Sequence, residues 1–169
     1  MEAALALAEN RLPDAEPRLR AYLRQDPFNV AAIRMMAELA ARIGRLGGAE
    51  KLLRRALELA PEFNAARANL ATVLHRMHRS QEAIAELDRL MLLEPENSGH
   101  ANLKAAASGR IGEYEEALRL YDRVLAQHPR HAKVWMSKGH ILKPLGRQAE
   151  AVDAYRRALE LAPGLGEAW

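Results

Sequence analysis

Basic side chains at a regular interval are the residues of this sequence best suited to binding an anionic ligand. Arg42, Arg76 and Arg110 follow one another at intervals of 34 residues. A guanidinium group binds carboxylates through paired hydrogen bonds, so such a row predicts a surface for an acidic peptide. The alternative is structural, since a cation in the last turn of a helix offsets the helix dipole, and this is the commoner role. Further basic residues flank the row: His75, His140 and Lys143.

Two asparagines add a second type of candidate contact. Asn69 and Asn102 fall in segments that we expect to be helical. A side-chain amide both donates and accepts, so each could hydrogen-bond the backbone of an extended ligand. Ordinary contact with solvent is the alternative, and the sequence does not separate the two.

Two histidine pairs have a spacing that metal sites also use. His75 and His78 are three residues apart, and so are His128 and His131. Both rings reach one ion only if the pair lies within a helix. We expect His78 in a turn, and Pro129 interrupts the other pair, so we predict no metal site.

Other catalytic chemistry lacks its usual residues. The chain has no Cys, which excludes thiolate catalysis, disulfides and cysteine-ligated metals. Gly44, Gly47 and Gly48 before Lys51 do not have the spacing of a phosphate-binding loop, and we expect them in a turn between two helices. We therefore predict a chain that is not an enzyme and that holds no cofactor.

Composition favours a helical globular protein. Of 169 residues, 49% are hydrophobic, 28% are charged and only 5% are aromatic, which argues against disorder and against a strand-rich fold. The formal net charge is only +3, a thin basic excess for a nucleic-acid binder. No apolar run is long enough to span a bilayer. We expect a cytoplasmic protein that binds neither nucleic acid nor membrane.

The interval of 34 residues organises the whole chain. The octapeptide at Arg54–Pro61 occurs again at Arg156–Pro163, three intervals later. A fixed period of this size indicates a repeat architecture. Three columns recur at the interval: Pro27, Pro61, Pro95, Pro129 and Pro163; Ala15, Ala49, Ala83, Ala117 and Ala151; and the small residues Ala37, Ala71, Ala105 and Gly139.

Each period predicts two antiparallel helices. Apolar residues recur at helical spacing within each half, and proline closes each pair because it cannot continue a helix. Gly44, Gly112 and Gly146 recur between the two helices, where a left-handed residue ends the first one, and His78 occupies this column once. The leading pair is weaker, and we place Pro13 and Pro17 at the beginning of its second helix. The other pairs are expected at 30–42 and 48–60, 64–77 and 80–93, 98–110 and 114–127, and 132–143 and 148–161.

These columns resemble the tetratricopeptide repeat family, and the resemblance spans nearly the whole chain. The best copy is 132–165, in which Trp135, Gly139, Gly146 and Tyr155 fall on the family pattern. Lys104 and Lys138 depart from it, since the family usually has Leu there, and we expect their stems to run along the edge of the core. The resemblance implies an all-α, right-handed superhelical solenoid of antiparallel helix pairs, with first helices lining a concave groove that binds a protein or peptide. It implies one domain over 1–169: a degenerate leading pair at 1–29, repeats at 30–63, 64–97, 98–131 and 132–165, and the start of a further repeat at 166–169.

A second resemblance concerns the C-terminal part of the chain. The stretch from Asn102 to Trp169 is similar to the repeat region that precedes a sulfotransferase domain in certain bacterial proteins. Because Trp169 shares a column with Trp135, we expect the sequence to be a fragment of a longer protein. An uncapped last repeat would then offer a surface for self-association.

Two functions follow as predictions. The first is a non-catalytic module that holds a protein or peptide, with an acidic segment favoured by the basic row. The second is an accessory region of a sulfotransferase whose catalytic domain lies downstream of this chain.

Overall fold

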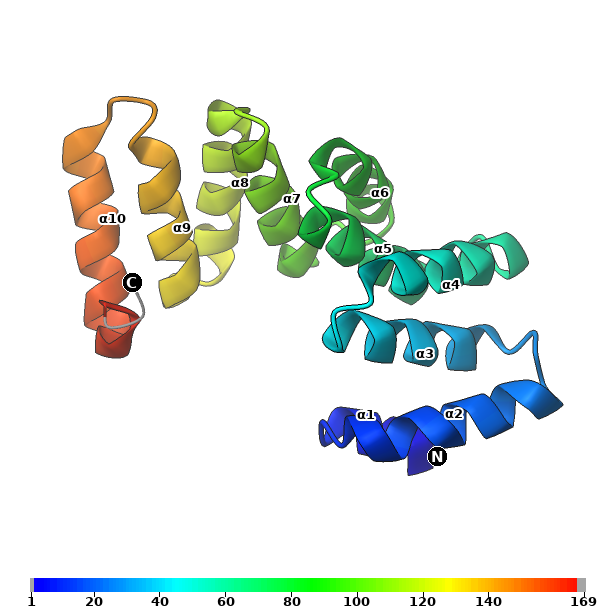
Figure 1. Ribbon diagram of the computed structural model, residues 1–169. Coiled ribbons are helices and arrows are strands. Elements are labelled where there is room, and N and C mark those ends of the chain that lie inside the picture. Colours follow the sequence, from blue (N-terminus) through cyan, green and yellow to red (C-terminus); the bar gives the residue numbers. More distant parts are fainter. Residues whose placement is uncertain (1, 167–169) are drawn as a thin grey trace. The chain divides into compact units, whose positions relative to one another are not determined.

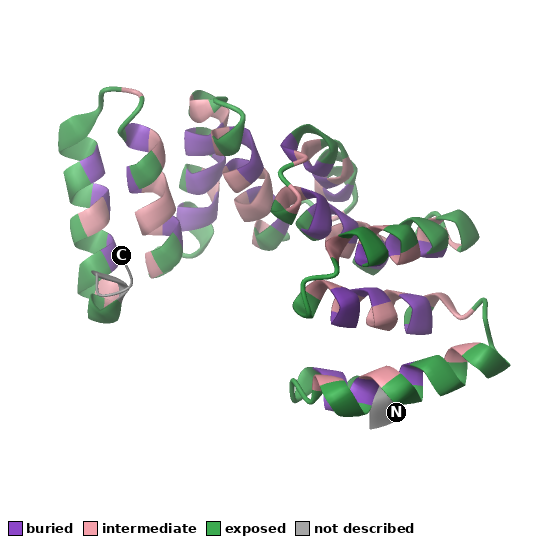
Figure 2. Ribbon diagram, viewed as in Figure 1, coloured by how far each residue is buried: buried purple, intermediate pink, exposed green. Residues whose placement is uncertain are grey.

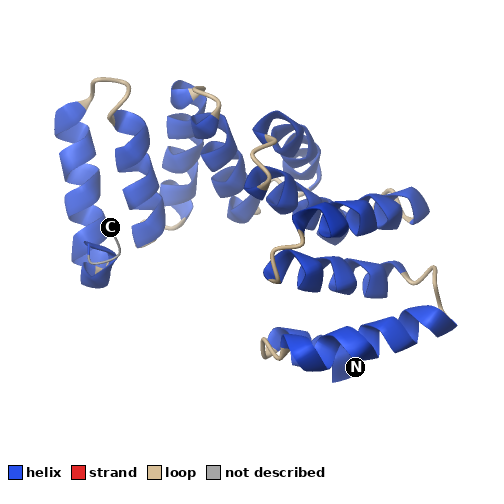
Figure 3. Cartoon of the chain, viewed as in Figure 1, coloured by secondary structure: helices blue, strands red, loops and turns tan. Residues whose placement is uncertain are grey.

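The computed structural model describes residues 2–166, and every regular element in this range is a helix (Figures 1 and 3). The all-α class and the antiparallel helix pairs are therefore confirmed. Most α-helices begin or end within two residues of the predicted bounds. The elements are α1 Glu2–Ala8, α2 Leu12–Gln25, α3 Val30–Arg42, α4 Leu46–Leu59, α5 Asn64–Arg76, α6 Ser80–Leu93, α7 Ser98–Arg110, α8 Tyr114–Gln127, α9 Ala132–Leu142, α10 Gln148–Leu161 and the 3-10 helix η1 Pro163–Gly166.

The chain forms two compact units, one ending at Arg79 and the other beginning at Ser80. In the first unit each helix from α1 to α5 packs against the next one, and α3 also contacts α5. In the second unit the helices from α6 to α10 pack in the same sequential way, and α7 also contacts α9. The single domain predicted over 1–169 stays a prediction. So does the further repeat at 166–169, because residues 167–169 lie outside the described part of the chain.

Small residues bring the two helices of each pair together. The alanine column is almost fully buried, from Ala15 at 0% exposure to Ala151 at 2%. In α9 the small residue is Gly139, and a Cβ atom added there would stand 2.5 Å from Cε1 of Tyr155. Buried residues accordingly lie on the helix faces that meet within each unit (Figure 2). The close approach of α9 and α10 depends on this glycine.

The turn inside each pair ends the first helix in the left-handed region. Gly44, Gly112 and Gly146 have φ of 81°, 86° and 72°, and His78 has φ of 62°, as the column predicts. Asn10 occupies the same column of the leading pair with φ of 58°. The leading pair therefore uses the same turn as the other repeats, although its sequence pattern is weak.

Two local predictions are wrong. Gly47, expected in the turn, and Gly48, expected at the boundary of turn and helix, both lie inside α4, which begins at Leu46 because three residues suffice for the preceding turn. Pro17 lies inside α2, five residues after its start at Leu12, so this helix loses the amide that would bond the carbonyl of Pro13. In both helices the packed apolar face outweighs a residue of poor helix propensity.

None of the helices in the described range is long and apolar enough to cross a membrane.

Candidate ligand-binding cleft

A cleft of about 250 Å³ lies in the first unit between α3, α4 and α5. It brings together three residues of the predicted ligand surface, namely Arg42, Asn69 and Arg76. Each repeat contributes the second half of its first helix, so the 34-residue spacing places equivalent side chains side by side. The full lining is Ala37, Glu38, Ala41, Arg42, Leu53, Asn69, Thr72, Val73 and Arg76.

The two arginines of the cleft join successive repeats. Arg42 Nη1 donates a hydrogen bond of 2.6 Å to the carbonyl oxygen of Leu7, near the end of α1. Arg76 Nη1 donates one of 2.9 Å to the carbonyl oxygen of Ala41, near the end of α3. Each of these carbonyls also accepts an amide hydrogen bond of 3.1 Å, from Asn10 or Gly44 of the following turn. The arginine therefore adds a second hydrogen bond and places its charge at the negative end of the dipole.

The two arginines differ in how far their charge is neutralised. Glu38 Oε1 accepts a hydrogen bond of 2.5 Å from Arg42, and its other oxygen lies 3.3 Å from Arg34 Nη1. Arg76 has no carboxylate partner among the described side chains, and it is exposed. The least compensated positive charge in the cleft is therefore that of Arg76.

Asn69 lies on the same helix as Arg76, two turns earlier and on the same face. Its side chain is half-buried and makes no hydrogen bond within the described part of the chain. By contrast, the hydroxyl of Thr72 donates to the carbonyl oxygen of Ala68 at 3.0 Å. The amide of Asn69 thus has both its donor and its acceptor available to a ligand in the cleft.

The remaining predicted residues lie elsewhere. His75 is half-buried in the last turn of α5. In the second unit Asn102 and Arg110 lie on α7, while His140 and Lys143 lie at the end of α9. None of these five residues lines the cleft, and their assignment to a ligand surface stays a prediction.

His140 contacts a neighbouring tyrosine. Its Nδ1 lies 3.1 Å from the hydroxyl of Tyr155, and the two rings meet edge to face with centroids 5.3 Å apart. Burial, with the nearby charge of Lys143, lowers the pKa of His140 below its ordinary value. The neutral imidazole is therefore favoured, which makes His140 a poor partner for an acidic ligand.

A charged network in the second unit was missed from the sequence. Lys104 Nζ of α7 lies 2.7 Å from Asp88 of α6 and 3.3 Å from Glu116 of α8. One repeat later, Lys138 Nζ lies 2.6 Å from Asp122. Although burial opposes its charge, the bonds to the two carboxylates raise the pKa of Lys104 above its ordinary value.

The spacing of the acidic residues in the sequence could have predicted this network. Asp88 and Asp122 are 34 residues apart, as are Glu116 and Glu150. Lys138 pairs with Asp122 as Lys104 pairs with Asp88, whereas the hydrogen bond from Arg147 is the main cause that lowers the pKa of Glu150. The lysine stems run into the core edge as expected, but their ammonium groups are paired rather than directed freely into solvent.

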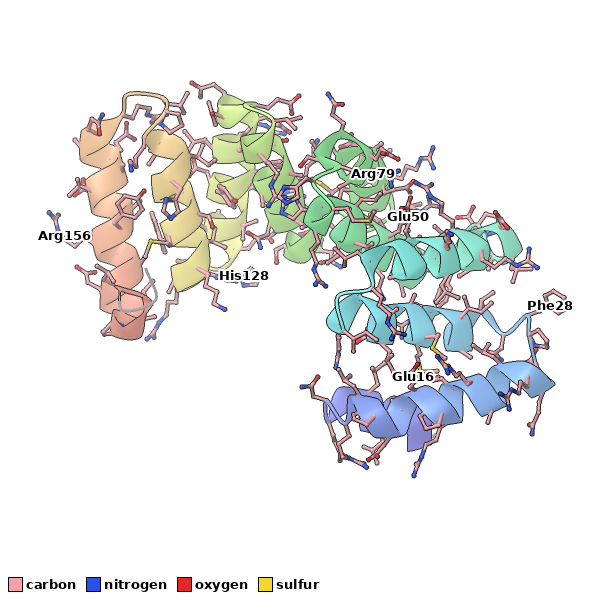
Figure 4. The ribbon with its side chains drawn as sticks, viewed as in Figure 1. Glu16, Phe28, Glu50, Arg79, His128 and Arg156 are labelled. Carbon is pink, nitrogen blue, oxygen red and sulfur yellow. The ribbon has the colours of Figure 1, made fainter. Side chains whose placement is uncertain are left out.

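A third pairing fixes α4 to the turn after α5. Glu50, which is 14% exposed, accepts a hydrogen bond of 2.9 Å from Arg54 and one of 2.7 Å from Arg79 (Figure 4). Burial raises the pKa of this carboxyl, but the two arginines outweigh it and hold the pKa below its ordinary value.

Within residues 2–166, no group of three or more His, Cys, Asp or Glu side chains is placed to hold a metal ion.

Solved structures with this fold are numerous, and their sequences are distant. A crystal structure of MamA matches with a TM-score of 0.82 and 20% identity, over 98% of this chain and 96% of that one. MamA from Desulfovibrio magneticus RS-1, residue 41 to the end, matches with a TM-score of 0.87 and 16% identity, over 96% of this chain and 92% of that one. YrrB, described as a TPR protein with an unusual peptide-binding site, matches with a TM-score of 0.80 and 20% identity, over 95% of this chain and 83% of that one.

Family models give the sequence evidence, while the search of curated proteins gave no match. One tetratricopeptide repeat model matches residues 6–62 and 43–107, and a second matches residues 102–165. The predicted likeness to a region preceding a sulfotransferase domain is not tested by these matches and stays a prediction. Because the matched segments extend from residue 6 to residue 165, the chain belongs to the tetratricopeptide repeat family.

Proposed function

We propose that this chain is a non-catalytic protein-interaction module that holds an acidic peptide segment in the cleft between α3 and α5. The observation that carries the proposal is the convergence of Arg42, Asn69 and Arg76 on one cleft from two successive repeats. The volume of the cleft suits one or two side chains of a ligand, while the rest of the peptide would run along the first helices.

Each residue has a distinct role in this proposal. Arg76 supplies the positive charge that attracts a carboxylate, since no carboxylate among the described side chains neutralises it. Asn69 supplies the hydrogen bonds that fix the ligand backbone. Arg42, held by Leu7 and Glu38, shapes one wall of the cleft and contributes less charge. The peptide-binding site named for YrrB supports this class of ligand for the fold.

Peptide selection tests the proposal. Peptides selected from a random library on the full chain are expected to be enriched in Asp and Glu. Charge reversal by Arg76→Glu should weaken binding of a selected peptide by about tenfold, measured by fluorescence anisotropy. Arg45→Glu is the matched control, because Arg45 is exposed in the turn before α4 and does not line the cleft.

A second variant separates binding from stability. Arg76 also bonds the backbone of α3, so its reversal is expected to lower stability slightly. Asn69 has no such bond, and Asn69→Ala should weaken peptide binding while leaving thermal unfolding unchanged. Equal affinity of the parent, Arg76→Glu and Asn69→Ala proteins would refute the proposed site.

A further inference from the structure

The second unit contains a separate hollow at the turn between α8 and α9. It is a shallow depression, open to solvent, with a volume of about 750 Å³. The α9 helix separates it from His140 and Lys143, which lie at the opposite end of that helix. The lining is Gln127, His128, Pro129, Arg130, His131, Ala132, Lys133 and Ala162.

Four of these residues are basic and none has an acidic partner. His128, Arg130, His131 and Lys133 are all exposed, and they make no side-chain hydrogen bond or ion pair within the described part of the chain (Figure 4 labels His128). Five other cations of this unit have a carboxylate at 2.6–2.9 Å: Arg119, Lys138, Arg147, Arg156 and Arg157. Positive charge is therefore concentrated and left uncompensated at this turn.

The repeat provides an internal comparison for these four positions. One period earlier they hold Glu94, Glu96, Asn97 and Gly99, and two periods earlier Ala60, Glu62, Phe63 and Ala65. The same turn thus forms with acidic or neutral residues. Because the fold does not need these basic residues, their presence at 128–133 points to a contact with something outside the chain.

The backbone of the turn is held in place. Trp135 Nε1 donates a hydrogen bond of 2.8 Å to the carbonyl oxygen of Pro129. His131 precedes α9 without capping it, whereas Asn29 and Asn97 accept amide hydrogen bonds at the start of α3 and α7. The positive end of the α9 dipole therefore adds to the charges of Arg130 and Lys133. Pro129, Ala132 and Ala162 supply apolar surface between them.

We infer that this basic hollow, residues 127–133 with Ala162, binds an acidic peptide segment of a partner protein. Carboxylate side chains would pair with Arg130 and Lys133, and the peptide backbone would lie over the apolar residues. The hollow exceeds the size of a single inorganic anion, which favours a peptide. The residues of this hollow differ from those of the cleft in the first unit, so each proposal can be tested independently of the other.

The test uses the full chain and a fluorescein-labelled peptide of alternating Glu and Ala. The double variant Arg130→Glu with Lys133→Ala brings in residue types that equivalent turns already contain, so we expect it to fold. The double variant should weaken peptide binding by about tenfold or more. The reason is that it removes two ion pairs with the peptide and introduces one repulsion between carboxylates. The matched control, Arg24→Glu with Lys51→Ala, makes the same charge change on exposed residues of the first unit and should alter affinity by less than about twofold.

Other outcomes assign the binding elsewhere. If Arg76→Glu abolishes binding and the double variant does not, the hollow is refuted while the cleft stands; the opposite result refutes the cleft. A labelled single-stranded RNA that binds more tightly than the peptide, with the same sensitivity to the double variant, would overturn the choice of ligand. Hydrogen exchange on the parent protein gives a second readout, and added peptide should protect the amides of 130–135.

Discussion

Arginine at the end of a first helix serves the neighbouring repeat more than its own. Arg42 and Arg76 each bond a carbonyl oxygen 35 positions earlier in the chain. The sequence predicted either a ligand-binding row or cations in the last turn that offset the helix dipole. Both arginines do lie in the last turn of their helix, and each also bonds the preceding first helix. That partner depends on the distance between stacked helices, which side-chain spacing within one helix does not reveal. The same contact aligns the guanidinium of Arg76 with the cleft.

Substitution of Gly139 tests the close contact between α9 and α10. A Cβ atom added there would stand 2.5, 2.7 and 2.9 Å from three ring atoms of Tyr155. Gly139→Ala should therefore reduce the free energy of unfolding by about 1–3 kcal/mol, measured by urea denaturation. Gly48→Ala is the matched control, since a Cβ there meets nothing within 4 Å and the residue lies inside α4. That change should raise stability by about 0.5–1 kcal/mol, and equal effects of the two would contradict the packing.

Glu50 predicts a dependence of stability on acid pH. Its pKa in the folded chain is held below 4.5 by Arg54 and Arg79. A depressed pKa stabilises the fold above the unfolded value, and that contribution is lost as pH falls through the folded pKa. Stability should fall between about pH 5 and pH 3, and Glu50→Gln should be less stable at pH 7 but lose less over this window. Parallel pH profiles of parent and variant would contradict the pairing.

At the scale of the helix, periodicity predicted the existence, the order and most of the ends. The α3, α6, α7, α8 and α10 bounds agree with the expected ranges, because column residues fix both their apolar faces and their turns. Gly47, Gly48 and Pro17 were placed in turns or first turns on local propensity. Burial of Ala49 and Leu53 in α4, and of Ala15 and Leu19 in α2, keeps these segments helical instead.

The lysine network predicts coupling between helices. Lys104 is 15% exposed and its partner Asp88 is 51% exposed, so solvent screens the pair only in part. A double-mutant cycle with Lys104→Met and Asp88→Asn should give a coupling of about 0.5–1 kcal/mol from urea unfolding. The control pair Arg156 and Asp153, both more than 60% exposed, should couple by about 0.2 kcal/mol. Equal coupling free energies in the two cycles would show that burial of the lysine stem does not strengthen the ion pair.

At the scale of the whole molecule, each helix contacts mainly its neighbours in sequence within its own unit. The free energy of unfolding of such stacks is approximately a sum of contributions from single repeats and from contacts between neighbouring repeats. A destabilising substitution therefore affects mainly its own repeat and the adjacent ones. Gly139→Ala should therefore raise hydrogen exchange of amides in α9 and α10 while leaving α2 to α4 unchanged. Mass spectrometry of peptic fragments measures both regions in one experiment. A uniform rise over the chain would mean that it opens as one cooperative unit.

The sequence predicted the repeat fold, its turns and three residues of the cleft. It did so because period and residue size determine which faces pack. It did not predict the basic hollow, where His128 and His131 drew attention only as a metal pair. What distinguishes that turn is the absence of acidic partners for Arg130 and Lys133 among the described side chains. That property depends on which helices are neighbours in space.

The most direct test of the proposed interaction function is to locate a selected acidic peptide on the full chain by NMR. Titration into 15N-labelled protein should shift the side-chain amide of Asn69 and the backbone amides of the last two turns of α3 and α5. These are the groups that line the cleft. Shifts confined to other helices, or no shift for a peptide that binds, would contradict the account.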